Sequence, residues 1–408
     1  MVSLPSLDSD VRKMLRSISE PITYFGEENW NRRDRLKKLL EGHPQISTDM
    51  EISSSPTNDE LFYTYGPPNL LPLRTKILNF SKEAAKIRKE RVGLTNDSEP
   101  ESKIPETCNL ASEVGDSRPL SCVRISPRGS VAVGGWSGAI KIFRENGLTF
   151  SGTVDVGMGG IRCCAVEWLN GELLIGGFSD GSIKFWNGLV SVHAENNQPS
   201  GRITRLSRLP LSSLFVSATS EGIWTLHDGT SAIYDQEGHA SGIFAIAAHP
   251  DCSLIASGDE DGVLRLWDLR SGRVVGGWTN THVGGMTALD FADNGWWLAS
   301  GGADNSVCIW DLRKAGPSAT GPLAGTLLAH SKSVGGLKWK GNSLVSGGYD
   351  GLVRVWSGRK FQVQQEFCIP AGGRVAAVDV GVSGNIVAAC SDRVVREWSQ
   401  EGRLKMEL

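Results

Sequence analysis

Two kinds of hydrophobic pattern divide the chain near residue 106. After this point, short apolar runs rich in Gly, Ala and Ser alternate with runs in which every second residue is apolar, as in LIASG followed by VLRLW. A period of two is typical of half-buried β-strands, whereas Val11, Leu15 and Ile18 recur at helical spacing. The pattern therefore predicts a small, mainly helical N-terminal region followed by a large all-β domain.

The β-strand pattern is an internal repeat. Asp-Gly hairpin signals such as Asp180-Gly181 and Asp350-Gly351 recur between the apolar runs. The aromatic anchors that follow the turns lie 40 to 46 residues apart, at Phe143, Trp186, His227, Trp267, Trp310, Trp356 and Trp398. This interval is typical of four-stranded propeller blades, so residues 107–408 are predicted to form a seven-bladed β-propeller. We expect the segment at 108–116 to supply the outer strand of the last blade and close the ring.

The sequence WDLR occurs at 267–270 and again at 310–313. Here the chain resembles the WD-repeat family, in which a His, a Ser, an Asp and the Trp of one repeat form a hydrogen-bonded network inside the blade. The resemblance implies three such tetrads, in the fourth, fifth and sixth repeats. By motif match they are His239, Ser257, Asp261 and Trp267; His282, Ser300, Asp304 and Trp310; and His330, Ser346, Asp350 and Trp356.

The recurring Ser, His and Asp residues are interpreted as structural. A catalytic triad needs one site with an exposed nucleophile, whereas this set recurs in three equivalent places and pairs each time with a Trp. The sequence also lacks GxxxxGK[ST], HExxH and GxSxG motifs. We therefore predict that the protein is not an enzyme and has no catalytic residue, cofactor or small-molecule substrate.

Composition supports this picture. The 49 Gly residues match a fold with many tight turns. The eight Cys residues contain no CxxC pair, so neither a zinc site nor a redox dithiol is indicated, and no metal site is predicted. No apolar stretch is long enough to span a membrane.

The formal net charge is only -3, but in the N-terminal region the charges are segregated. Residues 30–42 hold five basic and two acidic side chains, and residues 74–91 hold seven and two.

The predicted domain organisation follows from these changes in hydrophobic pattern and composition along the chain. The stretches 43–60 and 95–106 are polar, acidic and rich in Pro and Ser, which indicates linkers. Four regions result: 1–61, with a motif core at 11–40 and a polar linker; 62–92, a basic helical segment; 93–106, a flexible linker; and 107–408, the propeller.

The motif core closely resembles the splicing factor motif of pre-mRNA-splicing proteins, with matches that include Pro21, Phe25, Gly26, Arg32 and Leu36. Joined to seven WD repeats, it is similar to the WD-repeat proteins of the U4/U6 small nuclear ribonucleoprotein. The segments 62–92 and 115–143 are similar to the corresponding parts of that family. The resemblance implies a nuclear scaffold of the U4/U6 particle and of the U4/U6.U5 tri-snRNP. Its N-terminal motif would contact U4/U6 small nuclear RNA, and its propeller would dock a neighbouring particle protein.

The basic clusters are candidates for RNA contact. Basic side chains neutralise phosphates, and the aromatic residues Tyr24, Phe25 and Trp30 lie beside the first cluster. The alternative is an ordinary solvated face. The predicted RNA-contacting residues are Arg32, Arg33, Arg35, Lys37, Lys38, Lys82, Lys86, Arg88, Lys89 and Arg91.

Two further surface features concern proteins as partners. Trp278 and Trp296 are candidate protein-binding residues, and the alternative is a Trp that caps the edge of its blade. Trp297 falls on an inner strand and is expected in the core. The two WDLR sequences also resemble the WDxR element through which some WD-repeat proteins bind the adaptor of a cullin ubiquitin ligase. The alternative function is therefore a substrate receptor of such a ligase, with Arg270 and Arg313 as contacts.

Overall fold

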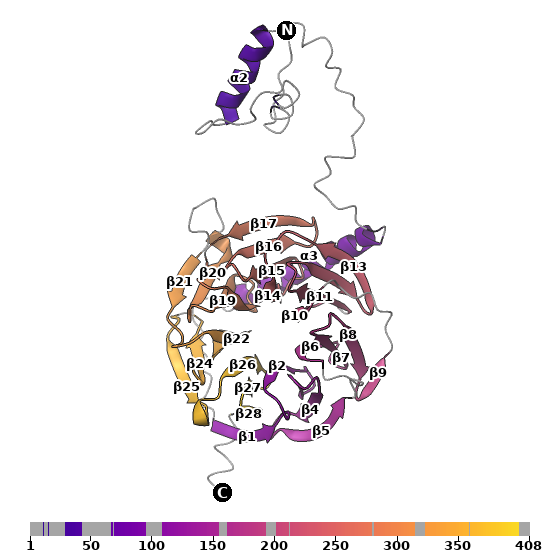
Figure 1. Ribbon diagram of the computed structural model, residues 1–408, viewed down its shortest axis with the longest axis vertical. Helices are drawn as coiled ribbons and strands as arrows, with labels where there is room; N and C mark the ends of the chain where they lie inside the picture. Colours follow the sequence, from indigo (N-terminus) through magenta and orange to yellow (C-terminus); the bar gives the residue numbers. More distant parts are fainter. Residues whose placement is uncertain are drawn as a thin grey trace. The chain divides into compact units, whose positions relative to one another are not determined.

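The computed structural model in Figure 1 describes residues 29–42, 67, 69–94, 108–154, 161–192, 201–211, 213–279, 281–314, 323–358 and 360–399, together with Val11 and Leu15. It divides into two compact units, Met1–Tyr65 and Gly66–Leu408, which we describe separately. The linker predicted at 43–60, residues 95–106 of the second linker, and most of the first predicted helix lie outside the described residues.

The first unit contains helix α2 (Asn29–Gly42). Its apolar side packs inward, because Leu36 is fully buried in a small cluster with Val11 and Leu15, and Leu39 packs against that cluster. The helix therefore has one packed side, whereas Lys37 and Lys38 are exposed.

Within the described residues, the strands of the second unit form seven four-stranded antiparallel sheets arranged as a ring (Figure 1). This confirms the predicted seven-bladed propeller. The first four blades are, in order, β2 (Leu120–Ile125), β3 (Ser130–Gly135), β4 (Ile140–Arg144) and β5 (Thr149–Val154); β6 (Cys163–Leu169), β7 (Leu173–Phe178), β8 (Ile183–Asn187) and β9 (Val190–Val192); β10 (Ile203–Arg208), β11 (Leu214–Thr219), β12 (Trp224–Asp228) and β13 (Ser231–Gln236); and β14 (Ile243–Ala248), β15 (Leu254–Asp259), β16 (Leu264–Asp268) and β17 (Arg273–Trp278).

The remaining three blades complete the ring. They are β18 (Met286–Phe291), β19 (Trp297–Gly302), β20 (Val307–Asp311) and β21 (Leu323–Leu327); β22 (Val334–Lys340), β23 (Ser343–Gly348), β24 (Leu352–Ser357) and β25 (Val363–Cys368); and β26 (Val375–Val380), β27 (Ile386–Cys390), β28 (Val394–Ser399) and β1 (Cys108–Val114). Two short 3-10 turns, η2 (Leu312–Lys314) and η3 (Pro370–Gly372), lie in loops.

Strand β1 closes the ring, as predicted. It precedes the first blade in the sequence but pairs antiparallel with β28 of the seventh, with Cys108 opposite Ser399 and Val114 opposite Val394. The edge of the last blade is thereby covered by the start of the domain.

The hydrophobic core lies within and between the blades. All seven aromatic anchors of the repeat are buried, the most exposed being Trp356 at 6%. Small residues on the second strands let neighbouring blades approach closely. A Cβ on Gly134, for example, would lie 2.7 Å from the Sγ atoms of both Cys122 in blade 1 and Cys163 in blade 2.

Helix α3 (Leu70–Leu94) belongs to the second unit and packs on the propeller. Leu73 and Ile77 are buried in one cluster with Leu214 of blade 3 and Trp267 of blade 4. The helix is therefore part of the propeller structure on one side and exposed on the other.

Candidate functional site

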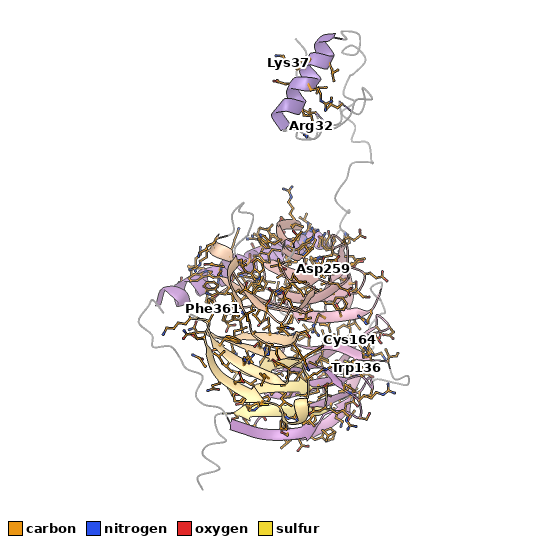
Figure 2. The ribbon with its side chains drawn as sticks, turned by 60° about the vertical axis from the view of Figure 1, so that its left-hand side comes forward. Arg32, Lys37, Trp136, Cys164, Asp259 and Phe361 are labelled. Carbon is orange, nitrogen blue, oxygen red and sulfur yellow. The ribbon has the colours of Figure 1, made fainter. Side chains whose placement is uncertain are left out.

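The predicted RNA-contacting residues of the first unit lie on α2, where Figure 2 labels Arg32 and Lys37. Lys37 and Lys38 are exposed, and Arg35 is half-buried. Arg32 is only 2% exposed and so lies on the packed side of the helix. The side chain of Arg33 lies outside the described residues. Among the described side chains of this cluster, Lys37 and Lys38 are therefore the two that a ligand can reach.

The second predicted cluster lies on α3. Lys82, Lys86 and Lys89 are exposed, whereas the side chain of Arg91 lies outside the described residues. Arg88 turns toward the propeller, where its guanidinium is 2.7 Å from the Asp251 carboxylate. It also donates a hydrogen bond of 2.8 Å to the carbonyl of Asn294. Arg88 therefore fastens α3 to blades 4 and 5, and the three lysines form the accessible part of this cluster.

The predicted tetrads of blades 5 and 6 are present. In blade 5, His282 Nε2 lies 2.7 Å from Ser300 Oγ, and the indole of Trp310 donates to the same oxygen at 2.9 Å. His282 Nδ1 lies 3.1 Å from the Asp304 carboxylate. In blade 6 the corresponding distances are 2.9 Å from His330 Nε2 to Ser346 Oγ, 2.9 Å from the Trp356 indole to the same oxygen, and 3.0 Å from His330 Nδ1 to Asp350.

The prediction for blade 4 is wrong in one member. His239 Nε2 lies 2.6 Å from Ser257 Oγ, and the Trp267 indole donates to that hydroxyl, but His239 Nδ1 contacts Asp259 at 2.8 Å rather than Asp261. Asp261 is exposed. The carboxylate of Asp259 also accepts the backbone N–H of Asp261, so it organises the turn from a position nearer the strand.

The three tetrad serines are unsuited to nucleophilic attack. Ser257, Ser300 and Ser346 have no exposed surface. Each hydroxyl is already engaged by a His ring and a Trp indole, so a substrate carbonyl has no access to the oxygen. Burial also lowers the pKa of His239 and His330, which favours the neutral imidazole in blades 4 and 6. These contacts support the structural interpretation of the tetrads.

Blade 3 uses a different pair at the same place. His227 stands where five other blades have a Trp anchor. Its Nε2 lies 2.8 Å from Ser217 Oγ. The ring stacks on Phe215 with a centroid distance of 4.5 Å. Burial lowers the pKa of His227 to about 3, so the ring stays neutral at physiological pH. It therefore acts as a packing residue with one hydrogen bond.

The candidate protein-binding tryptophans are both half-buried. Trp278 packs on Trp310 with ring centroids 5.8 Å apart. Trp296 is covered by the Arg313 guanidinium, 4.6 Å from its ring centroid. Trp297, expected in the core, is also half-buried and packs edge to face on Phe361 at 5.4 Å. Trp278 and Trp296 thus have intramolecular partners on at least one face, and their role in binding stays a prediction.

The two WDLR arginines are engaged within their own repeats. Arg270 Nε lies 2.9 Å from the Asp268 carboxylate. Arg313 donates from Nε and Nη2 to the two oxygens of Asp311, both at 2.9 Å, and this hydrogen bonding lowers the pKa of the Asp311 carboxyl. A ligase adaptor would have to share or displace these contacts.

A basic cavity at one mouth of the central channel is a feature that the sequence reasoning missed. Its volume is about 560 Å³, and its lining includes Trp136 and Cys164, labelled in Figure 2. Four arginines line it: Arg162, Arg202, Arg205 and Arg374. Glu260 is the one carboxylate among its described lining residues. We call this cavity the channel mouth.

Three of these arginines lie over aromatic rings of the same cavity. The guanidinium carbon of Arg162 is 3.9 Å from the centroid of Trp136. The corresponding distances are 5.8 Å from Arg202 to Phe244 and 6.0 Å from Arg374 to Tyr349. Such contacts are attractive because the face of an aromatic ring is electronegative.

The repeat explains how the mouth is assembled. In each blade, the residue after the second strand donates its backbone N–H to the carbonyl of the residue before the first strand, as Tyr349 does to Ser333. Trp136 and Tyr349 occupy the first of these positions, and Arg162, Arg202 and Arg374 occupy the second. The sequence signal for this cluster is therefore the recurrence of arginine and aromatic residues at these two equivalent positions of the seven repeats.

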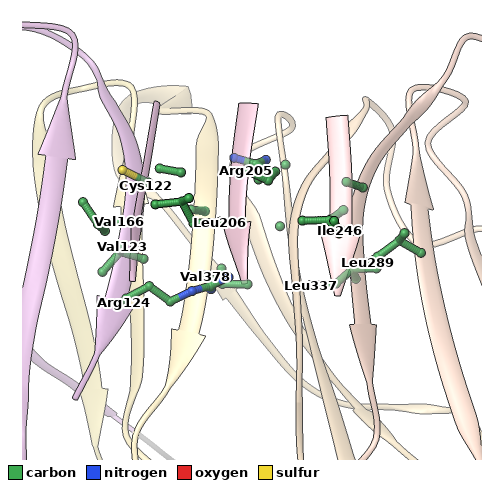
Figure 3. A pocket seen from close by; sticks show the side chains of 16 residues that line it. Cys122, Val123, Arg124, Val166, Arg205, Leu206, Ile246, Leu289, Leu337 and Val378 are labelled. Atoms are coloured by element: carbon green, nitrogen blue, oxygen red, sulfur yellow. The ribbon is translucent and has the colours of Figure 1, made fainter. Parts of the chain in front are cut away.

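Below the mouth the channel narrows to a cavity of about 50 Å³ lined by inner-strand residues of all seven blades (Figure 3). Arg205 and Arg124 lie in it at different depths. Arg205 donates to the carbonyl of Thr287 at 3.2 Å, and Arg124 pairs with Glu167 at 3.0 Å. Burial lowers the pKa of Arg205. The side chains of Arg205 and Arg124 thus occupy part of the channel below the mouth.

The described part of the chain has neither a metal-ligand cluster nor a membrane-spanning helix. No group of three or more His, Cys, Asp or Glu side chains there is placed to hold a metal ion. Among those residues, no helix has the length and apolar character needed to cross a membrane.

Two family descriptions match the sequence. Residues 11–39 match the family described as pre-mRNA processing factor 4 (PRP4) like, and residues 230–268, 276–311 and 321–357 match the WD domain, G-beta repeat. With the fold, these matches define a WD-repeat β-propeller protein that carries a PRP4-like motif.

Similar proteins include several named U4/U6 small nuclear ribonucleoprotein Prp4. The human protein of that name is 30% identical over 160 residues, which cover 35% of this chain and 31% of the relative. A PRP4-like protein of Arabidopsis thaliana is 31% identical over 172 residues, 36% of this chain and 31% of the relative. An uncharacterized WD repeat-containing protein of Schizosaccharomyces pombe is 33% identical over 188 residues, 41% and 39% of the two chains. The alignments thus cover less than 40% of each relative's length.

Proposed function

We propose that this protein is a non-enzymatic pre-mRNA splicing factor that acts as a scaffold in the U4/U6 small nuclear ribonucleoprotein and in the U4/U6.U5 tri-snRNP. Its N-terminal motif contacts U4/U6 small nuclear RNA, and its propeller docks a neighbouring protein of the particle. This role places it in the nucleus. The observation that carries the proposal is the PRP4-like match at residues 11–39 in the same chain as the WD-repeat propeller.

The charge distribution supports an RNA contact. The exposed lysines of α2 and α3 stand on helix faces whose opposite sides are packed, so their ammonium groups are held outward. A helix face of this kind neutralises phosphates without reading bases. The propeller supplies rigid loops for a protein partner.

Purification of the tagged full-length chain from cells, followed by sequencing of the bound small RNAs, tests the particle assignment. We expect U4 and U6 RNA to be enriched together with proteins of the same particle. Recovery of a cullin adaptor without either RNA would instead support the ligase receptor and contradict the proposal.

Charge reversal tests which residues contact RNA. The double variant Lys37→Glu/Lys38→Glu is compared with Lys314→Glu/Lys332→Glu, whose lysines are also exposed but lie on the propeller. Each lost phosphate contact should reduce the slope of log affinity against log salt for U4/U6 RNA by about 1. We expect a reduced slope for the first variant alone, and equal slopes for both variants would remove α2 from the RNA interface.

A further inference from the structure

The channel mouth carries an excess of positive charge that the propeller itself does not neutralise. Arg162, Arg202 and Arg374 are exposed, and among the described residues none of their guanidinium groups has an ion-pair partner. Arg205 adds a fourth positive charge at the floor, opposed by Glu260 alone within the lining. Charges of one sign gathered in a concave surface attract and concentrate ligands of the opposite sign.

Three of the four arginine side chains lie close to aromatic rings of the same cavity. The guanidinium of Arg162 lies 3.9 Å from the ring centroid of Trp136, and those of Arg202 and Arg374 lie at 5.8 and 6.0 Å from Phe244 and Tyr349. Attraction to a ring uses none of the guanidinium N–H groups in a hydrogen bond to a carboxylate, and a guanidinium can form two parallel hydrogen bonds with one carboxylate. The mouth is therefore prepared for planar anions that arrive from solvent.

The walls between the arginines favour an apolar side chain over a nucleobase. The hydroxyl of Ser121 already donates to the carbonyl of Cys163 at 2.6 Å, and that of Thr287 to the carbonyl of Val334 at 2.6 Å. Thr204 likewise donates to the carbonyl of Ala218 at 3.1 Å. A base would find few free groups for its polar edge, whereas Trp136 and Tyr349, 41% and 37% exposed, offer apolar surface.

The arrangement of the rings points the same way. Trp136, Phe244 and Tyr349 come from blades 1, 4 and 6, so they stand around the mouth rather than beside one another. Nucleic-acid stacking platforms need rings that successive bases reach in turn. A peptide that enters the centre of the ring meets arginines on several sides at once.

We propose that the channel mouth binds an acidic peptide segment of a partner protein. Its carboxylates pair with Arg162, Arg202 and Arg374, and one apolar side chain lies between the rings of the wall. The narrow channel below, with Arg205 fastened to the Thr287 carbonyl, stops the peptide at the mouth (Figure 3). This inference rests on the proposed function, in which the propeller docks a partner protein. It specifies the surface of the propeller that binds the partner and the chemistry of the bound segment. Peptide binding is measured without RNA or particle, so failure here is distinguishable from failure of the splicing assignment.

The test uses fluorescence anisotropy with the full-length chain. The probe is a fluorescein-labelled peptide of alternating Glu and Leu, compared with the same peptide carrying Gln in place of Glu, and with single-stranded oligouridine. Arg162→Glu and Arg374→Glu should each weaken binding of the acidic peptide by about tenfold, because a carboxylate pair is replaced by repulsion. Glu260→Gln should strengthen it by about threefold for the same electrostatic reason.

Arg144→Glu is the matched control, because Arg144 is exposed at the end of β4 and does not line the mouth. It should bind as the unaltered chain does. Equal affinity of Arg162→Glu and the control for the acidic peptide would overturn the proposal, as would equal binding of the Gln peptide. Tighter binding of oligouridine than of the acidic peptide, lost in Arg162→Glu, would assign the mouth to nucleic acid and also overturn it. Unchanged thermal midpoints show that the variants fold.

Discussion

At the scale of single residues, the tetrads show what a repeat alignment reveals and what it misses. The His, Ser and Trp of blades 4 to 6 follow from the motif, but blade 4 offers two carboxylates two positions apart. Asp259 occupies the place of Gly302 in blade 5 and Gly348 in blade 6. Only the course of the backbone in the structure shows that a side chain at the position of Asp259 reaches the His239 ring. The sequence could therefore predict the network but not which carboxylate completes it.

The same position yields a prediction for blade 5. In the Gly302→Ala variant the new Cβ would lie 2.3 Å from His282 Nδ1 and 2.5 Å from Asp304 Oδ1. Because both atoms belong to a buried network, the free energy of unfolding should fall by about 1–3 kcal/mol. Urea denaturation measures it. In the control, Gly325→Ala, the Cβ meets nothing within 4 Å, so stability should be nearly unchanged. Similar losses in both variants would show that the network tolerates the methyl group.

At the scale of secondary-structure elements, α3 was predictable as a helix but not as part of the propeller. Its basic residues are evident in the sequence, and so is its apolar side. Periodicity does not identify the partner of an apolar face, because the contact between Ile77 and the blade residues joins distant parts of the chain. Arg88 illustrates the consequence. It reads as one more surface charge, yet it pairs with Asp251.

We predict that docking of α3 contributes to the stability of the propeller. Ile77 is fully buried, so Ile77→Ala should lower the free energy of unfolding by about 2–4 kcal/mol through lost contacts and a cavity. Leu71→Ala on the same helix is the control, because Leu71 is 74% exposed. Guanidinium denaturation followed by tryptophan fluorescence compares the two. If Ile77→Ala were no less stable than Leu71→Ala, α3 would not be held by this face.

At the scale of the whole molecule, the ring is held at the seam where the seventh blade meets the first. The sequence predicted the pairing of β1 with β28, since a propeller must cover its last edge. It did not predict Glu397, which is fully buried beside that seam. Its two carboxylate oxygens accept the backbone N–H groups of Asn146 and Gly147 in blade 1, at 2.8 and 2.9 Å. A Glu in a strand carries no sequence signal for such a contact between blades that are remote in sequence.

Removing this carboxylate should loosen the ring. Glu397→Ala leaves two backbone N–H groups without an acceptor and opens a polar cavity, so the free energy of unfolding should fall by about 2–4 kcal/mol. Hydrogen exchange should quicken first in blades 1 and 7, which adjoin the seam. The control, Glu366→Ala, removes a partly exposed carboxylate that pairs with Arg354 at 2.7 Å, and should cost less than about 1 kcal/mol. Uniform quickening over all seven blades in Glu397→Ala would show that the ring unfolds as one unit, with no weak point at its seam.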